Sequence, residues 1–236
     1  MRNVKRLMIV LVGILLSLLF CACSLIKIPI AGTSYPTTPD DTTTQENSPE
    51  SSASDLSANP EGFAYRNDYF KLACTLPDDW YVLNQQEIIQ FFGFIDDLSS
   101  KSETVEQVQG VVEGAQAHYD FYAMTTDGMT TINAIASSIT VLDFLSSEQR
   151  TIEESIPLFL KTMEELGIEN QTTSTDNIQF CGEKHVVLNV QWEFNGMIMY
   201  EKSLFIRRGF SILAISVASY SADKTDDILG YWSKLK

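Results

Sequence analysis

The chain has 236 residues, of which 16 are Lys or Arg and 31 are Asp or Glu, so its formal net charge is −15 at pH 7. Phosphate backbones repel such an acidic chain, which argues against a nucleic-acid partner. With 44% hydrophobic and 20% charged residues, the composition also excludes collagen, coiled-coil and wholly disordered proteins.

The first residues have the pattern of an export signal. Arg2, Lys5 and Arg6 precede an apolar run without charges from Leu7 to Phe20. A basic segment followed by an apolar segment of this length is typical of a secretory signal peptide. We therefore expect the rest of the chain to be exported.

The residues that follow resemble the lipobox of bacterial lipoproteins, in which a small residue precedes a cysteine that is diacylated on sulfur before cleavage. Cys23 fits this pattern because Ala22 is small, whereas Cys21 follows the bulky Phe20. Phe20 also stands third before Cys23, where the pattern favours Leu. The resemblance implies a signal peptide over residues 1–22, lipidation (palmitate) at Cys23, and a protein anchored to the cell membrane that faces outside the cytoplasm.

An uncleaved membrane anchor is the alternative. Extended through Ile26, the apolar stretch reaches about 20 residues, which just spans ~30 Å of hydrocarbon. Under both interpretations, the rest of the chain is exported. If Cys23 is lipidated, the acyl chains must hold this acidic protein at an anionic membrane, so the membrane is the first expected partner.

Residues 23–60 are predicted to be a disordered tether behind the lipidated cysteine. Within it, residues 32–60 contain 12 Ser or Thr, four of the seven prolines, five acids and no base. Such a segment cannot bury enough apolar surface to offset the entropy lost on ordering. From residue 61 the composition changes, because 12 of the 13 Phe and all three Trp follow. Residues 61–236 are expected to form a single globular domain.

The domain is predicted to begin with strands at Phe63–Tyr65 and Tyr69–Leu76 and a helix capped by Asn84 with Glu87. The helix would present Ile88, Phe91, Phe92 and Ile95 on one face. A weaker helical period follows around residues 105–115. Two strands over residues 119–124 and 130–142 are joined by a turn at Asp127–Gly128.

The second half is predicted to be a helix followed by a meander. The helix spans Thr151–Leu166, with an alternative start at Ser155 because Pro157 removes an interior donor. A strand near Ile178–Cys181 comes next. Three further strands cover 186–194, 197–207 and 210–218, with turns at Asn195–Gly196 and Arg208–Gly209, and a final helix covers about 223–235.

The meander determines the predicted fold class. If the turn at Asn195–Gly196 has two residues, one face of the sheet carries Val186, Leu188, Val190, Trp192, Phe194, Met197, Met199 and Phe205, and the other carries Val187, Ile198, Leu204 and Ile206. Both faces are apolar, so both must be covered. We therefore expect an α+β fold, an antiparallel sheet meander with helices on both faces.

The opening residues of the domain resemble a known family. Tyr65-Arg66-Asn67-Asp68-Tyr69-Phe70-Lys71-Leu72, followed by Leu76-Pro77-Asp78-Asp79-Trp80, is similar to the start of PsbP-like domains and of uncharacterised Gram-positive lipoproteins. In that pattern Gly usually stands at the position of Asp79. The resemblance implies the α-β-α sandwich of that family, and it transfers no catalytic residue.

No motif in the chain specifies a chemical activity. The two histidines are His118 and His185, and Cys181 stands four residues before His185, so that a thiol nucleophile with a base can be imagined. The Gly-Glu-Lys between them favours a hairpin instead. No metal-binding, phosphate-binding or dinucleotide-binding motif occurs, so no cofactor and no metal are predicted.

Two sets of residues are candidate sites. Trp80, Tyr81 and Trp232 could line an aromatic ligand cleft, although core packing explains each of them too. Cys74 and Cys181 are the two thiols that remain once Cys21 is removed and Cys23 is acylated. In an exported domain they could form a disulfide, or each could serve as a small buried hydrophobe.

The expected function is therefore that of a non-enzymatic binding or accessory module, anchored outside the cytoplasmic membrane, with a protein or small-molecule partner. The alternative is an envelope hydrolase with an unrecognised active site. A polar cluster in a deep cleft would favour the enzyme, and an apolar surface would favour the binding module.

Overall fold

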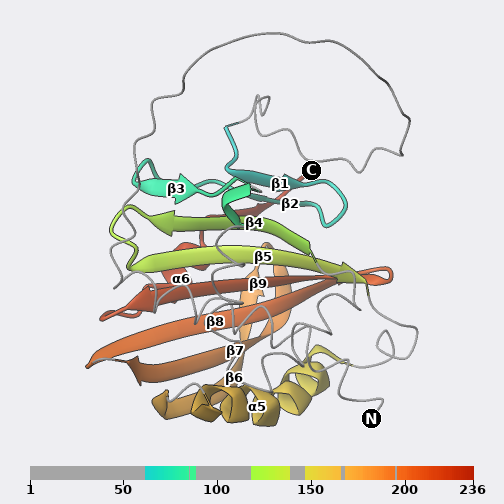
Figure 1. The fold of residues 1–236 in the computed structure, drawn as a ribbon. Coiled ribbons are helices and arrows are strands. Elements are labelled where there is room, and N and C mark those ends of the chain that lie inside the picture. Colours follow the sequence, from blue (N-terminus) through green and yellow to red (C-terminus); the bar gives the residue numbers. More distant parts are fainter. Residues whose placement is uncertain (1–61, 85, 89–117, 139–146, 166–167, 195) are drawn as a thin grey trace, which may run out of the picture.

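The computed structural model describes residues 62–84, 86–88, 118–138, 147–165, 168–194 and 196–236. Most of these residues lie in strands (Figure 1). In chain order the elements are β1 (Tyr65–Asn67), β2 (Leu72–Cys74), β3 (Trp80–Val82), β4 (His118–Thr125), β5 (Thr130–Ser138), α5 (Glu148–Glu165), β6 (Glu169–Phe180), β7 (Glu183–Phe194), β8 (Met197–Arg208), β9 (Ser211–Tyr220), α6 (Thr225–Leu229) and β10 (Trp232–Lys234).

Two antiparallel sheets contain all of these strands. The large sheet has seven strands in the order β3-β4-β5-β9-β8-β7-β6, so β5, β9 and β8 lie at its centre. The small sheet has the order β1-β2-β10 and therefore joins the first and the last described strands of the chain. Trp232 of β10 is the register partner of Cys74 in β2.

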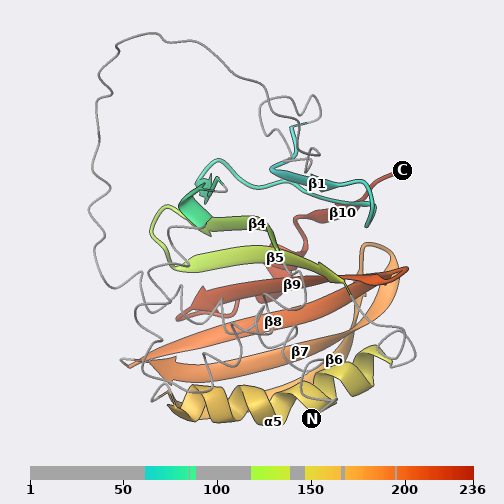
Figure 2. The same ribbon diagram turned by 45° about the vertical axis from the view of Figure 1, so that its right-hand side comes forward.

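One face of the large sheet is covered by α5, which contacts β6 and β7 (Figure 2). Ile152, Phe159 and Met163 of this helix are fully buried, and they pack with Leu188, Trp192 and other apolar residues of the sheet. The helix forms because its apolar residues recur every three or four positions. Leu83 and Ile88 pack on the same face at the other side, where the Leu83 amide donates to the Tyr122 carbonyl of β4.

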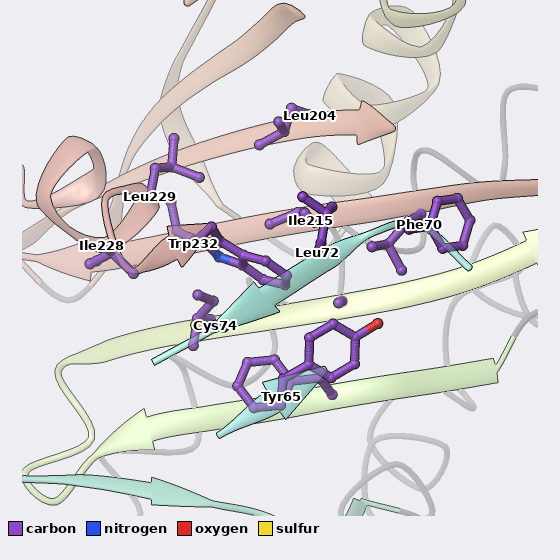
Figure 3. Close-up of a cluster of buried hydrophobic side chains, with 14 of the residues drawn as sticks. Tyr65, Phe70, Leu72, Cys74, Leu204, Ile215, Ile228, Leu229 and Trp232 are labelled. Atoms are coloured by element: carbon purple, nitrogen blue, oxygen red, sulfur yellow. The ribbon is translucent and has the colours of Figure 1, made fainter. Parts of the chain in front are cut away.

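The opposite face is covered by the small sheet and α6 (Figure 3). Tyr65, Phe70, Leu72 and Cys74 from the small sheet pack against Leu204, Leu213, Ile215 and Val217 of β8 and β9, together with Ile228, Leu229 and Trp232. The Tyr65 ring stacks on Phe121 with centroids 5.0 Å apart. Lys202 of β8 forms an ion pair with Asp226 of α6 and fixes that helix on the sheet.

The predicted fold class is wrong. The structure is not an α-β-α sandwich of the PsbP-like kind, because on this second face the cover is mainly another sheet. The apolar spacing of Ile228, Tyr231, Trp232 and Leu235 predicted one long helix, but α6 ends at Leu229 and Trp232 begins a strand. Pairing with β2 satisfies the backbone of these residues, and this tertiary contact overrides the local helical pattern.

The predicted meander register is confirmed. Phe194 pairs with Met197 across the β7–β8 turn, so the loop has two residues. Leu188, Val190 and Trp192 pack on the α5 face, and Leu204 and Ile206 pack on the other. The next turn lies one residue later than predicted, because Arg208 pairs with Ser211.

Other elements differ in length or were missed. The helix α5 begins at Glu148 and continues through Pro157 to Glu165. The strand β6 spans twelve residues, of which only Ile178–Phe180 were expected, because the polar run from Glu169 to Asn177 has no apolar alternation. The short strand β3 was not predicted.

The helix start at Asn84 is confirmed by its hydrogen bonds. The Asn84 side-chain oxygen accepts from the amides of Gln86 and Glu87 at 2.9 and 3.0 Å, and the Asn84 amide donates to the Glu87 carboxylate at 2.8 Å. This reciprocal pair is a capping box. Phe91, Phe92, Ile95, the helical period around 105–115, strand residues 139–142 and residues 1–60 lie outside the described residues.

Within the described ranges, no helix combines the length and the apolar character needed to cross a bilayer.

Candidate functional site

A set of polar side chains forms the middle of the large sheet on its α5 face. Strand alternation places them on this face, because their neighbours in sequence pack with the small sheet. We call this set the polar floor; it consists of Tyr122, Thr131, Asn133, Ser137, Glu201, Ser203, Arg207 and Ser216. All of them are buried except Arg207, which is partly exposed.

The sheet register brings these residues together from four strands. One row across the sheet runs from Tyr122 through Asn133 and Ser216 to Ser203. A neighbouring row contains Thr131, Ala218 and Glu201. Among the described residues, α5 packs on this face against β6 and β7, and Leu83 bonds to β4.

Small side chains occupy the centre of the floor. On β9 this face presents Ala214, Ser216 and Ala218 in succession, and Ser203 lies beside Ser216. Longer polar side chains, those of Asn133 and Glu201, flank this centre. Rigid elements such as these strands hold binding groups more accurately than loops do.

Hydrogen bonds connect part of the floor. The Ser203 hydroxyl donates to the Glu201 carboxylate at 3.1 Å and lies 2.7 Å from the Ser216 hydroxyl oxygen. Glu201 is only 1% exposed. A carboxylate that is this deeply buried is rare in protein interiors, and clefts that bind ligands are one place where it occurs.

Two hydroxyls of the floor have no hydrogen-bond partner within the described structure. These are the Thr131 and Ser137 side chains, which are 0% and 4% exposed. A buried hydroxyl without a partner costs roughly 1–3 kcal/mol, so such groups in native proteins usually bond to water or to a ligand. The floor thus offers donors and acceptors that a bound molecule can use.

Sequence reasoning missed the polar floor. Its members are scattered over residues 122–216, and each is an isolated polar residue within a strand. A signal was nevertheless present, because Glu201, Ser203 and Arg207 stand at the alternate positions of β8 that also carry Met199 and Phe205. Polar residues at core-facing strand positions mark either a network or a site.

The three aromatic residues predicted to line a cleft do not come together. Trp80 and Trp232 both belong to the core beneath the small sheet, where Trp232 is buried against Tyr65, Phe121 and Phe180. Tyr81 points to the opposite side of β3 and is 48% exposed. Its hydroxyl donates to the Glu87 carboxylate.

Cys74 and Cys181 are free thiols that pack in the same cluster beneath the small sheet. His185 is not paired with Cys181. Its Nδ1 atom lies 3.2 Å from the Glu148 carboxylate of α5, and its ring packs on Phe180 with centroids 6.2 Å apart. These contacts connect α5 to the β6–β7 hairpin. His118 begins β4.

The described part of the chain contains no cluster of three or more His, Cys, Asp or Glu side chains arranged to hold a metal ion. The polar floor itself contains hydroxyls, one amide, one carboxylate and one guanidinium, but no histidine, thiol or amine. Such a set can bind a polar molecule.

No protein-family model and no curated protein matches this chain. Among solved structures, LpqN of Mycobacterium tuberculosis, described as involved in cell envelope biogenesis, is similar with 14% identity and a TM-score of 0.39, covering 70% of this chain and 83% of that one. PA94 of Pseudomonas aeruginosa, a protein of unknown function, has 16% identity and a TM-score of 0.25, covering 42% and 62%. Both likenesses are too distant to assign a family or an activity.

Proposed function

We propose that this chain is a lipid-anchored protein at the outer side of the cytoplasmic membrane, and that its folded part binds a small polyhydroxylated molecule on the polar floor. The observation that carries the binding function is the row of buried polar side chains on β5, β9 and β8.

The anchor is supported by the sequence alone. Three basic residues, an apolar run and the Ala22–Cys23 pair form a lipoprotein signal, and residues 23–60 supply a tether between the lipid and the domain. Intact mass spectrometry of the protein extracted with detergent tests this part. We expect a chain that begins at Cys23 and carries acyl groups, whereas a retained Met1 would contradict it.

The ligand class follows from the groups on the floor. One carboxylate and one guanidinium balance each other in charge, and the remaining groups are hydroxyls and an amide. An uncharged molecule rich in hydroxyls can use these donors and acceptors, because each hydroxyl both donates and accepts. A strongly charged ligand would leave one floor charge without compensation.

A thermal-shift series tests the binding function. The probes are a panel of monosaccharides, disaccharides, amino sugars and inositol. A ligand at 100 times its dissociation constant stabilises the folded state by about 2.7 kcal/mol, which shifts the melting temperature by several degrees. We expect at least one class of compound to give such a shift.

Variants assign the shift to the floor. Ser203→Ala and Glu201→Gln should abolish it, while Ile215→Val, which changes the opposite face of β9, should keep it. If no compound binds, and native mass spectrometry finds no small molecule on the extracted protein, the proposal of a binding function is wrong. If a bound compound is hydrolysed, the protein is an enzyme.

A further inference from the structure

Two turns that are far apart in the sequence meet at one end of the molecule. They are the β1–β2 turn with Tyr69 and the β8–β9 turn with Arg208, Gly209 and Phe210 (Figures 1 and 2). We call these four residues the aromatic tip. The Tyr69 hydroxyl donates to the Arg208 carbonyl at 2.7 Å, and the Arg208 guanidinium lies 5.8 Å from the centre of the Tyr69 ring.

The close approach of the two turns depends on Gly209. Its φ is +55°, and a Cβ atom at this position would lie 2.9 Å from the Tyr69 hydroxyl. The two turns are therefore held together by a hydrogen bond, a cation–π contact and a residue without a side chain. The arrangement is a built surface, not two loose loops.

This surface is aromatic and exposed. Tyr69 is 50% exposed and Phe210 is 57% exposed, although most aromatic side chains of the described residues are buried. Aromatic side chains that remain in water at a fixed position mark contact surfaces, and a ring with a polar group suits the boundary between water and lipid.

The charge around the tip is opposite to that of the chain. Five bases lie on or beside the tip, namely Arg66, Lys71, Arg208, Lys234 and Lys236. Lys236 follows Leu235, whose amide donates to the Lys71 carbonyl. Three acids lie there, namely Asp68, Asp120 and Glu183. The excess is two positive charges in a chain whose net charge is −15.

We propose that the aromatic tip docks on the anionic surface of the lipid bilayer that holds the anchor, and so orients the domain on the membrane. The inference rests on the proposed lipid anchor. Aromatic rings insert at the headgroup level and the surrounding Arg and Lys side chains contact anionic lipid, while the acidic remainder of the domain is repelled and faces away.

The tether allows this orientation. The described chain starts at Gly62 and runs antiparallel to β2 near Cys74, at the end of the small sheet opposite Tyr69. A flexible chain of about 38 residues has an end-to-end distance of roughly 35 Å. The small sheet is about 10 Å long, because each of its strands has three residues. This length is shorter than the end-to-end distance of the tether, so the tip can reach the bilayer.

Hydroxyl-radical footprinting of the complete lipidated protein tests the proposal. The protein is reconstituted in nanodiscs of pure phosphatidylcholine or of phosphatidylcholine with 30% phosphatidylglycerol. Tyr81 is an internal control, because it is exposed to almost the same extent as Tyr69 and also forms a side-chain hydrogen bond. In the anionic nanodiscs we expect the oxidation rates of Tyr69 and Phe210 to fall at least threefold, and that of Tyr81 to stay unchanged.

Salt and variants identify the cause. At 1 M NaCl the Debye length is about 3 Å, so the difference between the two nanodiscs should disappear. Arg208→Gln should lower the equilibrium constant for docking by about fivefold, because one basic residue near an anionic surface contributes about that factor. Lys161→Gln, a matched change on exposed α5, should have no effect.

The outcomes separate this proposal from the proposed function. Equal oxidation rates in both nanodiscs with a correctly acylated protein would overturn the docking alone. A mass without acyl groups would overturn the anchor and the docking with it. Protection that requires an added envelope extract would assign the tip to a protein partner, and would also overturn the membrane proposal.

Discussion

Among single residues, the two thiols of the domain show how burial controls reactivity. Burial, together with the neighbouring Cys181, raises the pKa of the Cys74 thiol to about 12. Burial and the charge of Glu183 raise the pKa of Cys181 to about 11, against the lowering effect of Lys234. Thiols with such pKa values are protonated near neutral pH and react slowly. A catalytic role for Cys181 with His185 therefore has no support in the structure.

The raised pKa of Cys74 predicts a loss of stability in alkali for the reduced protein. Below pH 9 the thiol is protonated in both the folded and the unfolded state, so its contribution is constant. Between pH 9 and about 12 only the unfolded chain releases the proton, and the free energy of unfolding falls by up to about 1.4 kcal/mol per pH unit.

Urea unfolding of reduced protein between pH 8 and 11 checks this prediction. Other groups titrate in the same range, so the comparison is with Cys74→Val, which has a similar volume and no titrating proton. The variant should show a shallower decline than the parent. Identical slopes would contradict the raised pKa.

At the scale of elements, α5 is a helix with an interior defect. Pro157 stands within the helix and is exposed, so the Glu153 carbonyl has no amide to accept from at that position. The buried stripe of Ile152, Phe159 and Met163 continues across the defect. Packing on β6 and β7 thus stabilises a helix that local sequence would interrupt.

Pro157→Ala is expected to stabilise the protein by about 1–3 kcal/mol, because alanine supplies the missing donor and has a high helix propensity. Thermal unfolding followed by circular dichroism measures the change. A lower melting temperature would mean that the bend at Pro157 is needed to fit α5 to the sheet.

The second prediction at this scale concerns the connection between the two sheets. Cys74 of β2 pairs with Trp232, the ring of Trp232 lies 6.1 Å from that of Phe180, and Cys181 follows Phe180. The two cysteines thus belong to adjacent parts of one cluster. We expect them to form a disulfide when the protein is exported, by exchange with an oxidised disulfide carrier, which is reduced in turn.

Alkylation of the denatured protein before and after reduction measures the number of free thiols. Protein from an oxidising compartment should take up no label until it is reduced. A bridge closing a loop of roughly 100 residues should add about 4–5 kcal/mol to the free energy of unfolding. Cys74→Ser and Cys181→Ser should each remove this gain, and labelling of both thiols without reduction would contradict the disulfide.

For the whole molecule, the small sheet is the contact that unites the chain. Its strands come from the beginning and the end of the described residues, and its apolar side covers one face of the large sheet. Trp232 is central to this cover, because its ring contacts Tyr65, Phe121 and Phe180. Its indole nitrogen is buried and has no hydrogen-bond partner among the described residues.

Trp232→Ala should therefore lower the free energy of unfolding by about 3–5 kcal/mol, since it leaves a large cavity between the sheets. Trp232→Phe keeps an aromatic ring and removes a buried donor without a partner, so it should cost less than about 1.5 kcal/mol. Urea unfolding of both variants compares them. Similar losses for the two would show that the indole nitrogen has a partner.

The features that the sequence predicted are those that depend on short-range interactions. The capping box at Asn84, the stripe of α5 and the two-residue turn before Met197 depend on neighbours within a few positions, and they were predicted. The strand β6 was mostly missed because its polar side chains carry no alternation; only pairing with β7 makes it a strand. The last helix was predicted to be too long, because only pairing with β2 makes residues 232–234 a strand.

By itself, the sequence determined the alternation and the turns of the meander and the two apolar faces of the sheet, because these depend on local geometry and on the period of the side chains. Only the tertiary structure decided that a second sheet covers one face, and that Ser216 lies between Asn133 and Ser203 on the other. These contacts join residues between 13 and about 160 positions apart. Such pairings depend on sheet register, which no short stretch of sequence specifies.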